Sequence, residues 1–272
     1  LNAIGQPNTA VPTGVGALDK ALGGLEPAVY IVAGRPSMGK TAFLLEMLAN
    51  VCGAGRRCVL FSIEMSASQI VERLAARKAE VSLQAIAQNE APPADTSKYA
   101  KALWEVATWP LTIVDKATLT ANDVLSDVQR EQMQHGQVDA VFVDGLWLMT
   151  ATDKHQSRVQ EVGSISRDMK RVQRDLNLPI IMAHQLSRAC ELRADKRPIL
   201  SDLRETGDVE QDADVVLMMY REGYYDNTHP DANVVEVWIR KNRLHGPSGE
   251  CVKLFWRAAC MAFLPLAAPI KL

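Results

Sequence analysis

The sequence lacks any apolar run that approaches the roughly 20 residues needed to span a bilayer. It also lacks an excess of one charge: 30 basic residues nearly cancel 32 acidic ones, which excludes an overall basic coat for nucleic acid. Any contact with nucleic acid must therefore come from a local basic cluster. No C-x-x-C pair occurs among the five cysteines, which favours reduced, structural thiols over a metal site. We expect a cytoplasmic protein that does not enter a membrane.

What is present is an ordinary globular composition, with 47% hydrophobic and 23% charged residues in a chain of 272. A chain of this length buries enough apolar surface to need no disulfide. It begins with Leu1 and shows no charged and apolar leader, so we expect no secretory signal and interpret it as a piece of a longer protein. Residues 1–12 are predicted to be a remnant linker, and residues 13–272 one domain.

Compact apolar runs alternate with amphipathic stretches along most of the chain. The predicted strands are 29–33, 58–63, 111–114, 140–144, 180–184 and 215–220, and the predicted helices are 41–51, 68–79, 98–108, 121–134 and 157–176. This alternation predicts an α/β fold with a mostly parallel sheet flanked by helices. Two further runs, 234–241 and 250–256, predict a C-terminal antiparallel hairpin. The APPAD segment, residues 91–95, is predicted to be a surface loop.

A Gly-rich segment joins the first predicted strand to the first predicted helix. Residues 34–41 read GRPSMGKT and match G-x-x-x-x-G-K-[ST] in the strand-to-helix context that this motif requires. Backbone N–H groups there can surround phosphates, Lys40 can reach the β- and γ-phosphates, and Thr41 can hold Mg²⁺. The alternative is a Gly-rich turn that binds no nucleotide. The predicted nucleotide-binding residues are Gly34, Arg35, Pro36, Ser37, Met38, Gly39, Lys40, Thr41 and Ala42.

Three polar residues stand at the ends of other predicted strands. Asp144 follows an apolar strand and is expected to share the metal ion with Thr41, although a strand-end acid that caps the following turn would show the same pattern. Glu64 is placed to orient and deprotonate water, although a helix N-cap or a surface acid would show the same spacing. Gln185 can sense a γ-phosphate, and a plain strand-end residue explains it equally well. Because the carboxyl ends of parallel strands meet at one edge, we expect these residues to converge with Lys40.

The order of these motifs resembles the C-terminal RecA-like domain of the DnaB-family replicative helicases. The matching segments, which extend over about residues 13–256, are TGVGALDKALGGL, GRPSMGKT (Walker A), FSIEM with Glu64, the Walker B strand that ends at Asp144, HQLSR around Gln185, SDLRETGDVEQDADVVLMMYR, and KNRLHGPSG. The resemblance implies a P-loop ATPase that uses ATP and Mg²⁺ and moves 5′ to 3′ on single-stranded DNA as a homo-hexamer. It also implies a primase and a helicase loader as partners, through an absent N-terminal region or the ring surface.

Individual roles follow from the same resemblance. Glu64 resembles the catalytic base, Asp144 the Walker B acid, and Gln185 the γ-phosphate sensor. Lys241 and Arg243, in KNR, resemble the lysine and the arginine finger that reach the nucleotide of a neighbouring subunit. Without the resemblance, a solvated strand edge is the interpretation that we would favour for these two cations.

The DLRETG segment, residues 202–207, resembles the family loop that grips single-stranded DNA in the central channel. Arg204 can neutralise a phosphate, Gly207 allows close backbone approach, and Glu205 lies in the same loop, where it can pair with a neighbouring arginine. The loop contains no aromatic residue, so binding is expected to be largely independent of base sequence. The basic stretch at 156–176 is more simply a solvated helix face.

Two positions depart from the family pattern. A tyrosine usually follows the Walker B aspartate and a glutamine lies two places further, whereas this chain has Gly145 and Trp147. The departure concerns local packing and coupling to the next loop rather than metal binding.

A RecA-type recombinase and a regulatory RecA-like ATPase are the alternative functions. DLRETG and KNRLHGPSG disfavour the first, and the presence of Glu64 and Arg243 disfavours the second. Because half of the implied site belongs to a neighbouring subunit, the isolated domain is expected to bind ATP far better than it hydrolyses it.

Overall fold

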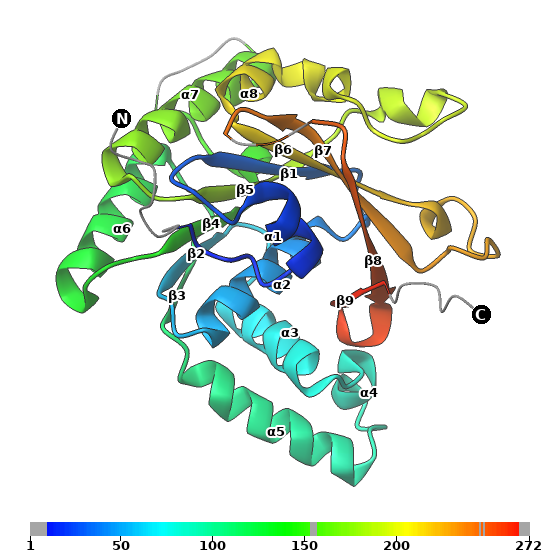
Figure 1. Ribbon diagram of the computed structural model, residues 1–272. Helices are drawn as coiled ribbons and strands as arrows, with labels where there is room; N and C mark the ends of the chain where they lie inside the picture. Colours follow the sequence, from blue (N-terminus) through cyan, green and yellow to red (C-terminus); the bar gives the residue numbers. More distant parts are fainter. Residues whose placement is uncertain (1–9, 153–156, 245, 247, 267–272) are drawn as a thin grey trace.

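The structure is a computed structural model that describes residues 10–152, 157–244, 246 and 248–266, without the side chains of 204–207. A nine-stranded sheet with the order β3-β2-β4-β5-β1-β6-β7-β8-β9 forms the centre of the described chain (Figure 1). Its strands are β1 (Val29–Gly34), β2 (Cys58–Ser62), β3 (Leu111–Asp115), β4 (Ala140–Asp144), β5 (Ile180–Gln185), β6 (Val215–Arg221), β7 (Val234–Asn242), β8 (Cys251–Arg257) and β9 (Ala262–Pro265).

Helices cover the sheet. The α-helices are α1 (Gly16–Leu22), α2 (Lys40–Gly53), α3 (Ala67–Ala79), α4 (Leu83–Ala87), α5 (Pro93–Ala107), α6 (Ala121–His135), α7 (Arg158–Leu176) and α8 (Gly207–Asp212). The 3-10 helices are η1 (Leu146–Leu148), η2 (Arg188–Leu192), η3 (Leu200–Thr206), η4 (Glu222–Tyr224) and η5 (Ala258–Cys260). Among the described residues, no helix is both long enough and apolar enough to cross a bilayer.

Strands β1 to β6 pair in parallel, and β6 to β9 pair in antiparallel fashion, so the predicted mixed fold is confirmed. The predicted hairpin corresponds to β7 and β8. β9 was not predicted, because a four-residue strand is too short to show an alternating pattern. The parallel strands all end at the same edge of the sheet, where Gly34 lies opposite Gln185.

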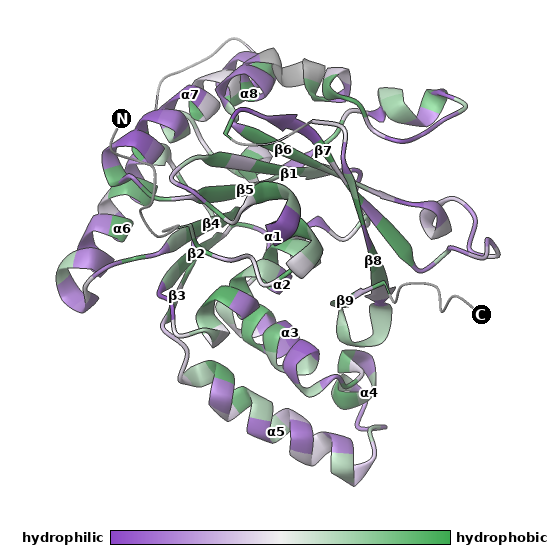
Figure 2. Cartoon of the chain, in the orientation of Figure 1, coloured by the Kyte–Doolittle hydropathy of each residue, from purple (hydrophilic) through white to green (hydrophobic). Residues whose placement is uncertain are grey.

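The core has two layers, one on each face of the sheet. In β1, Tyr30 and Val32 pack with α1, α2 and α3, whereas Val29, Ile31 and Ala33 pack with α6 and α7. A strand that is buried on both faces must be apolar at every position, which is why the sequence shows a continuous run there. In Figure 2 the central strands are hydrophobic, and hydrophilic residues lie along α6 and α7.

Two predictions about chain segments need correction. The segment 91–95 is not a loop throughout, since α5 begins at Pro93. Proline suits the first turn of a helix because its missing N–H would have no intrahelical partner there. At the N-terminus, residues 1–9 of the predicted linker lie outside the described residues. Val11 already belongs to the domain, since it is buried and exchanges two backbone hydrogen bonds with Leu25.

Candidate active site

The segment 34–41 forms a tight loop between β1 and α2. Gly39 has φ +95° and precedes the first residue of the helix, and Phe263 lies 3.4 Å from the position that a Cβ atom would take. Only glycine adopts this left-handed conformation at low cost. Because the loop opens a helix, its backbone N–H groups and the helix dipole favour an anion such as a phosphate.

Lys40 is buried at the start of α2, with 7% of its surface exposed. Its Nζ donates to the carbonyl oxygen of Arg35 at 3.0 Å and stands 5.6 Å from the centre of the Trp147 ring. Burial lowers the pKa of Lys40 to about 8, although the carboxyl groups of Asp144 and Glu64 oppose this shift. A bound triphosphate would supply the negative charge that this buried ammonium lacks.

Thr41, the residue after Lys40, is in direct contact with Asp144. The Thr41 hydroxyl donates to Oδ1 of Asp144 at 3.1 Å, and Asp144 is 3% exposed at the end of β4. Burial raises the pKa of Asp144 to about 6, while the hydrogen bond from Thr41 and the charge of Lys40 act in the opposite direction. A hydroxyl and a carboxylate oxygen are the donors that Mg²⁺ prefers, so the predicted pair fits this ion.

Glu64 lies exposed in the turn between β2 and α3. The hydroxyl of Ser62 donates to the carbonyl oxygen of Met65 at 2.8 Å and accepts from its backbone N–H at 3.2 Å, which fixes the turn. Ser66, rather than Glu64, is the N-cap of α3. The N-cap alternative for Glu64 is therefore wrong, and its carboxylate is free to face the cavity.

These groups surround a cavity of about 290 Å³, lined by Pro36, Ser37, Gly39, Lys40, Thr41, Ala42, Glu64, Arg73, Trp147, Gln185, Trp256 and Met261. The predicted residues Gly34, Arg35, Met38 and Asp144 do not line it, although Asp144 contacts the lining residue Thr41. Gly34 still belongs to β1, and the Met38 side chain is 2% exposed in the interior. The Arg35 side chain turns away toward Leu186 and Glu191.

Four lining residues were missed by the sequence analysis: Arg73, Trp147, Trp256 and Met261. Arg73 lies on α3, and its charge lowers the pKa of Asp144. Trp256 and Met261 arrive from β8 and the turn before β9, which no motif marks. Only Trp147 carried a signal, because it departs from the family pattern beside Asp144.

Gly145 and Trp147, the two departures from the family pattern, are linked structurally. Gly145 has φ +115°, and a Cβ atom there would stand 3.2 Å from Leu148. This glycine conformation starts the short helix η1, which holds the Trp147 ring between Lys40 and His184. Trp147 thus forms a wall of the nucleotide cavity.

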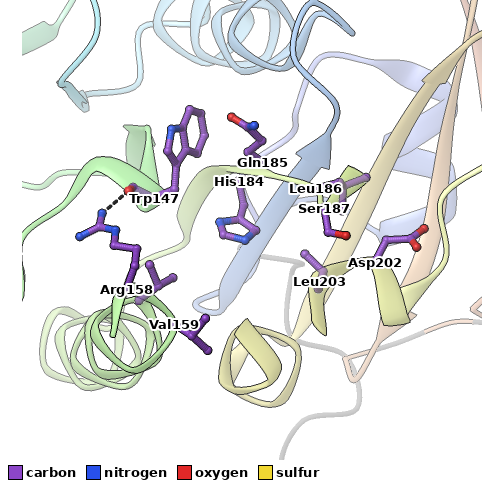
Figure 3. Close-up of a pocket in the computed structure, with 10 residues that line it drawn as sticks. Trp147, Arg158, Val159, His184, Gln185, Leu186, Ser187, Asp202 and Leu203 are labelled. Carbon is purple, nitrogen blue, oxygen red and sulfur yellow. Dashed lines mark hydrogen bonds between the residues drawn. The ribbon is translucent and has the colours of Figure 1, made fainter. Parts of the chain in front are cut away.

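Trp147 and Gln185 also line a second cavity of about 300 Å³ (Figure 3). Gln185 ends β5 and is exposed, whereas His184 is buried beneath it with its ring 6.5 Å from that of Trp147. The far side of this cavity is formed by Arg158 and Val159 at the start of α7. Gln185 therefore stands between the nucleotide cavity and a second space.

The buried His184 predicts a pH dependence of stability. Burial lowers its pKa to about 4, with a contribution from Lys40. Below pH 6.5, His184 binds a proton in the unfolded chain but not in the folded chain. The contribution of His184 to stability is therefore fully present above pH 6.5 and is lost as the pH falls toward 4. We expect His184 to account for a loss of about 2 kcal/mol between pH 7.5 and 5.0.

Urea unfolding of the parent and of His184→Gln at both pH values checks this prediction. The drop in unfolding free energy should be smaller by that amount in the variant, whatever its stability at pH 7.5. An equal drop in the two proteins would assign the pH dependence to other groups.

Lys241 and Arg243 do not join the cavity. β7 runs antiparallel to β6, and Lys241 lies opposite Val216 near the start of β6, at the other edge of the parallel sheet. Lys241 donates to the carbonyl oxygen of Glu210, and Arg243 donates to that of Gln211 at 2.8 Å. Neither cation is placed to reach the nucleotide of its own chain.

The predicted DNA-contacting residues Arg204, Glu205 and Gly207 lie in η3 and at the first residue of α8, and their side chains are outside the described part of the structure. On α7, the bases Arg158, Arg167, Lys170 and Arg171 form ion pairs with Glu161, Asp208, Asp214 and Asp168 respectively. These acids reduce the positive charge of that face, as expected for a solvated helix.

A mostly parallel sheet with a P-loop after β1 and acids at the ends of β2 and β4 defines a P-loop ATPase of the RecA-like class. The chain belongs to the DnaB-like helicase C terminal domain family, whose model matches residues 10–264. This assignment confirms the resemblance seen in the motifs.

Individual relatives agree. The chain is 36% identical to the replicative DNA helicase DnaB of Geobacillus stearothermophilus over 89% of its own length and 53% of the relative's. It is 39% identical to the replicative DNA helicase DnaB of Pasteurella multocida over 95% of its own length and 56% of the relative's. The chain thus spans about half the length of the curated relatives it matches.

Solved structures show the same fold. One of them, an ATPase domain, has a TM-score of 0.91 and 34% identity, with 97% of this chain and 93% of that one covered. Another is a DnaB-like replicative helicase described with its interactions with primase. It has a TM-score of 0.90 and 35% identity, with 95% of this chain and 64% of that one covered.

Proposed function

We propose that this chain is the ATP-hydrolysing motor domain of a replicative DNA helicase, which moves 5′ to 3′ on single-stranded DNA as a hexameric ring. The observation that supports the proposal is that the residues to which the family resemblance assigns roles lie at two opposite edges of the sheet. Lys40, Glu64 and Asp144 meet at one edge, while Lys241 and Arg243 lie at the other. A ring that stacks one edge of each subunit against the opposite edge of the next would complete every site.

Within one subunit, each residue has a distinct task. Lys40 binds the β- and γ-phosphates, and Thr41 and Asp144 would hold Mg²⁺, which would neutralise phosphate charge. Glu64 accepts a proton from the water that attacks the γ-phosphorus, as the bond to the ADP oxygen breaks. Gln185 contacts the γ-phosphate. When hydrolysis removes this phosphate, Gln185 transmits the change to the loop that follows β5.

Partners are proposed on the same basis. Arg204, Glu205 and Gly207 would line the channel and contact single-stranded DNA, mainly through its phosphates. One structural neighbour is described with primase. We propose a primase as a partner of the complete protein on this basis, and a helicase loader on the basis of the family resemblance, and we place the protein in the cytoplasm.

The test is the rate of ATP hydrolysis with and without single-stranded DNA, measured on the longest available form of the protein together with its oligomeric mass. We expect a hexamer whose hydrolysis rises with DNA. An intact hexamer that DNA does not stimulate would refute the motor proposal. Strand exchange without unwinding would favour the recombinase alternative.

A further inference from the structure

Arg35 has an unusual position for a residue of the P-loop. Its side chain is 9% exposed and points away from the nucleotide cavity. Nη1 donates to the carbonyl oxygen of Leu186 at 2.7 Å, and Nε donates to the carboxylate of Glu191 at 2.9 Å. Its own carbonyl oxygen accepts from Nζ of Lys40. Arg35 therefore contacts both the phosphate-binding lysine and the chain that follows β5.

The chain from Leu186 to Leu203, here called the connecting segment (residues 186–203), follows β5 and ends with the first two residues of DLRETG. Its first residue extends the pairing of β1 and β5, since the Leu186 N–H donates to the carbonyl oxygen of Gly34 at 3.2 Å. The Arg35 contacts add a side-chain bond to Leu186 and an ion pair with Glu191 in η2. One end of the segment is thus fixed to the P-loop.

The other end is fixed at Asp202, the first residue of DLRETG. Asp202 is 2% exposed, and its carboxylate accepts two hydrogen bonds from Arg193 at 2.7 Å and one from the backbone of Ile199 at 2.8 Å. Its carbonyl oxygen accepts from the N–H of Ser187 at 3.2 Å. Because Ser187 adjoins Leu186, a displacement at the P-loop end reaches DLRETG through few contacts.

The connecting segment adjoins an unfilled space. The second cavity, about 300 Å³, is lined by Leu186, Ser187, Asp202 and Leu203 from this segment (Figure 3). Closely packed protein interiors resist displacement, so a shift of the segment toward this space would meet less resistance than a shift into the core.

We propose that the Arg35–Glu191 ion pair is the contact through which occupancy of the P-loop positions the connecting segment and hence DLRETG. When Lys40 exchanges the Arg35 carbonyl oxygen for a phosphate, the backbone of Arg35 is released, and its side chain transmits the shift to Glu191. Glu191 is a positioning residue that touches no nucleotide. The effect of Glu191 on DNA binding by DLRETG rests on the motor function proposed above. The change that nucleotide binding produces in the connecting segment does not rest on it.

The test compares Glu191→Gln with a matched control, Glu131→Gln. Glu131 on α6 pairs with Arg57 at the same N–O distance of 2.9 Å, and its side chain is more buried than that of Glu191, with 7% against 31% exposed. Arg57 precedes β2 at the edge opposite the nucleotide. Hydrogen exchange of residues 186–203 is measured with and without a non-hydrolysable ATP analogue and Mg²⁺. Affinity for the analogue and the thermal midpoint are measured alongside.

In the parent and in Glu131→Gln we expect the analogue to change exchange in residues 186–203. In Glu191→Gln that change should fall at least about threefold with analogue affinity unaltered, and Glu191→Asp, which keeps the charge, should recover part of it. A full response in Glu191→Gln, or no response in the parent, would overturn the inference. If Glu191→Gln does not fold, a reduced response in Glu191→Asp supports the inference and a full response overturns it.

A second measurement separates this inference from the motor proposal. In the DNA-stimulated ATPase assay, Glu191→Gln should keep the basal rate and the KM for ATP but lose most of the stimulation. An equal fall of basal and stimulated rates would indicate a merely structural role and overturn the inference. A parent that shows the exchange response without DNA stimulation would refute the motor and leave the coupling standing.

Discussion

Glu64→Gln is expected to lower the rate of ATP hydrolysis by about 10²- to 10⁴-fold while leaving ATP affinity nearly unchanged. The substitution keeps the size of the side chain and removes only its ability to accept a proton. Glu64 is exposed, is not the cap of α3, and lies in a turn that Ser62 and Met65 hold without it. We therefore expect folding stability to be unaffected.

Turnover under saturating ATP and nucleotide affinity by calorimetry check this expectation. Glu72→Gln is the matched control, because Glu72 is exposed on α3 and does not line the cavity. It should hydrolyse ATP at the parent rate. If Glu64→Gln does so too, the proton acceptor is another group and the assigned mechanism is wrong.

The convergence of Lys40, Glu64, Asp144 and Gln185 was predictable because each follows an apolar strand, and parallel strands present their carboxyl ends at one edge. This reasoning needs only local patterns and a topological rule. It predicts which residues come together, although not which way their side chains turn. Gly34, Arg35 and Met38 belong to the same motif and still do not line the cavity.

The residues that escaped prediction are brought to the site by tertiary packing. Trp256 and Met261 arrive from the antiparallel end of the sheet, and Phe263 in β9 packs against Gly39. Nothing in their local sequence indicates a nucleotide. The Arg35–Glu191 pair joins positions 156 residues apart, and ion pairing between distant residues leaves no periodic signal.

Arg243→Ala is expected to lower the hydrolysis rate of the assembled ring by about 10³- to 10⁵-fold, the range for loss of an arginine finger. Within its own chain the residue loses one hydrogen bond to the carbonyl oxygen of Gln211, so the subunit should still fold. Nucleotide affinity should change far less than turnover, because the guanidinium acts on charge that develops in the transition state.

Mixing two inactive variants distinguishes action on the neighbouring subunit from action within one chain. In a ring with head-to-tail contacts, an Arg243→Ala subunit keeps Glu64, and a Glu64→Gln subunit keeps Arg243. In an equal mixture, roughly a quarter of the interfaces unite an intact cavity with an intact finger, so hydrolysis should reappear.

The control mixes Arg243→Ala with a chain that carries both substitutions, which creates no intact interface and should remain inactive. If neither mixture recovers activity although mixed rings form, Arg243 does not act across the interface. The placement of Lys241 and Arg243 at the edge opposite their own P-loop would then require another explanation, such as a structural role at the end of α8. Recovery in the first mixture alone would show that hydrolysis requires residues from two subunits, because no single chain holds both halves of the site.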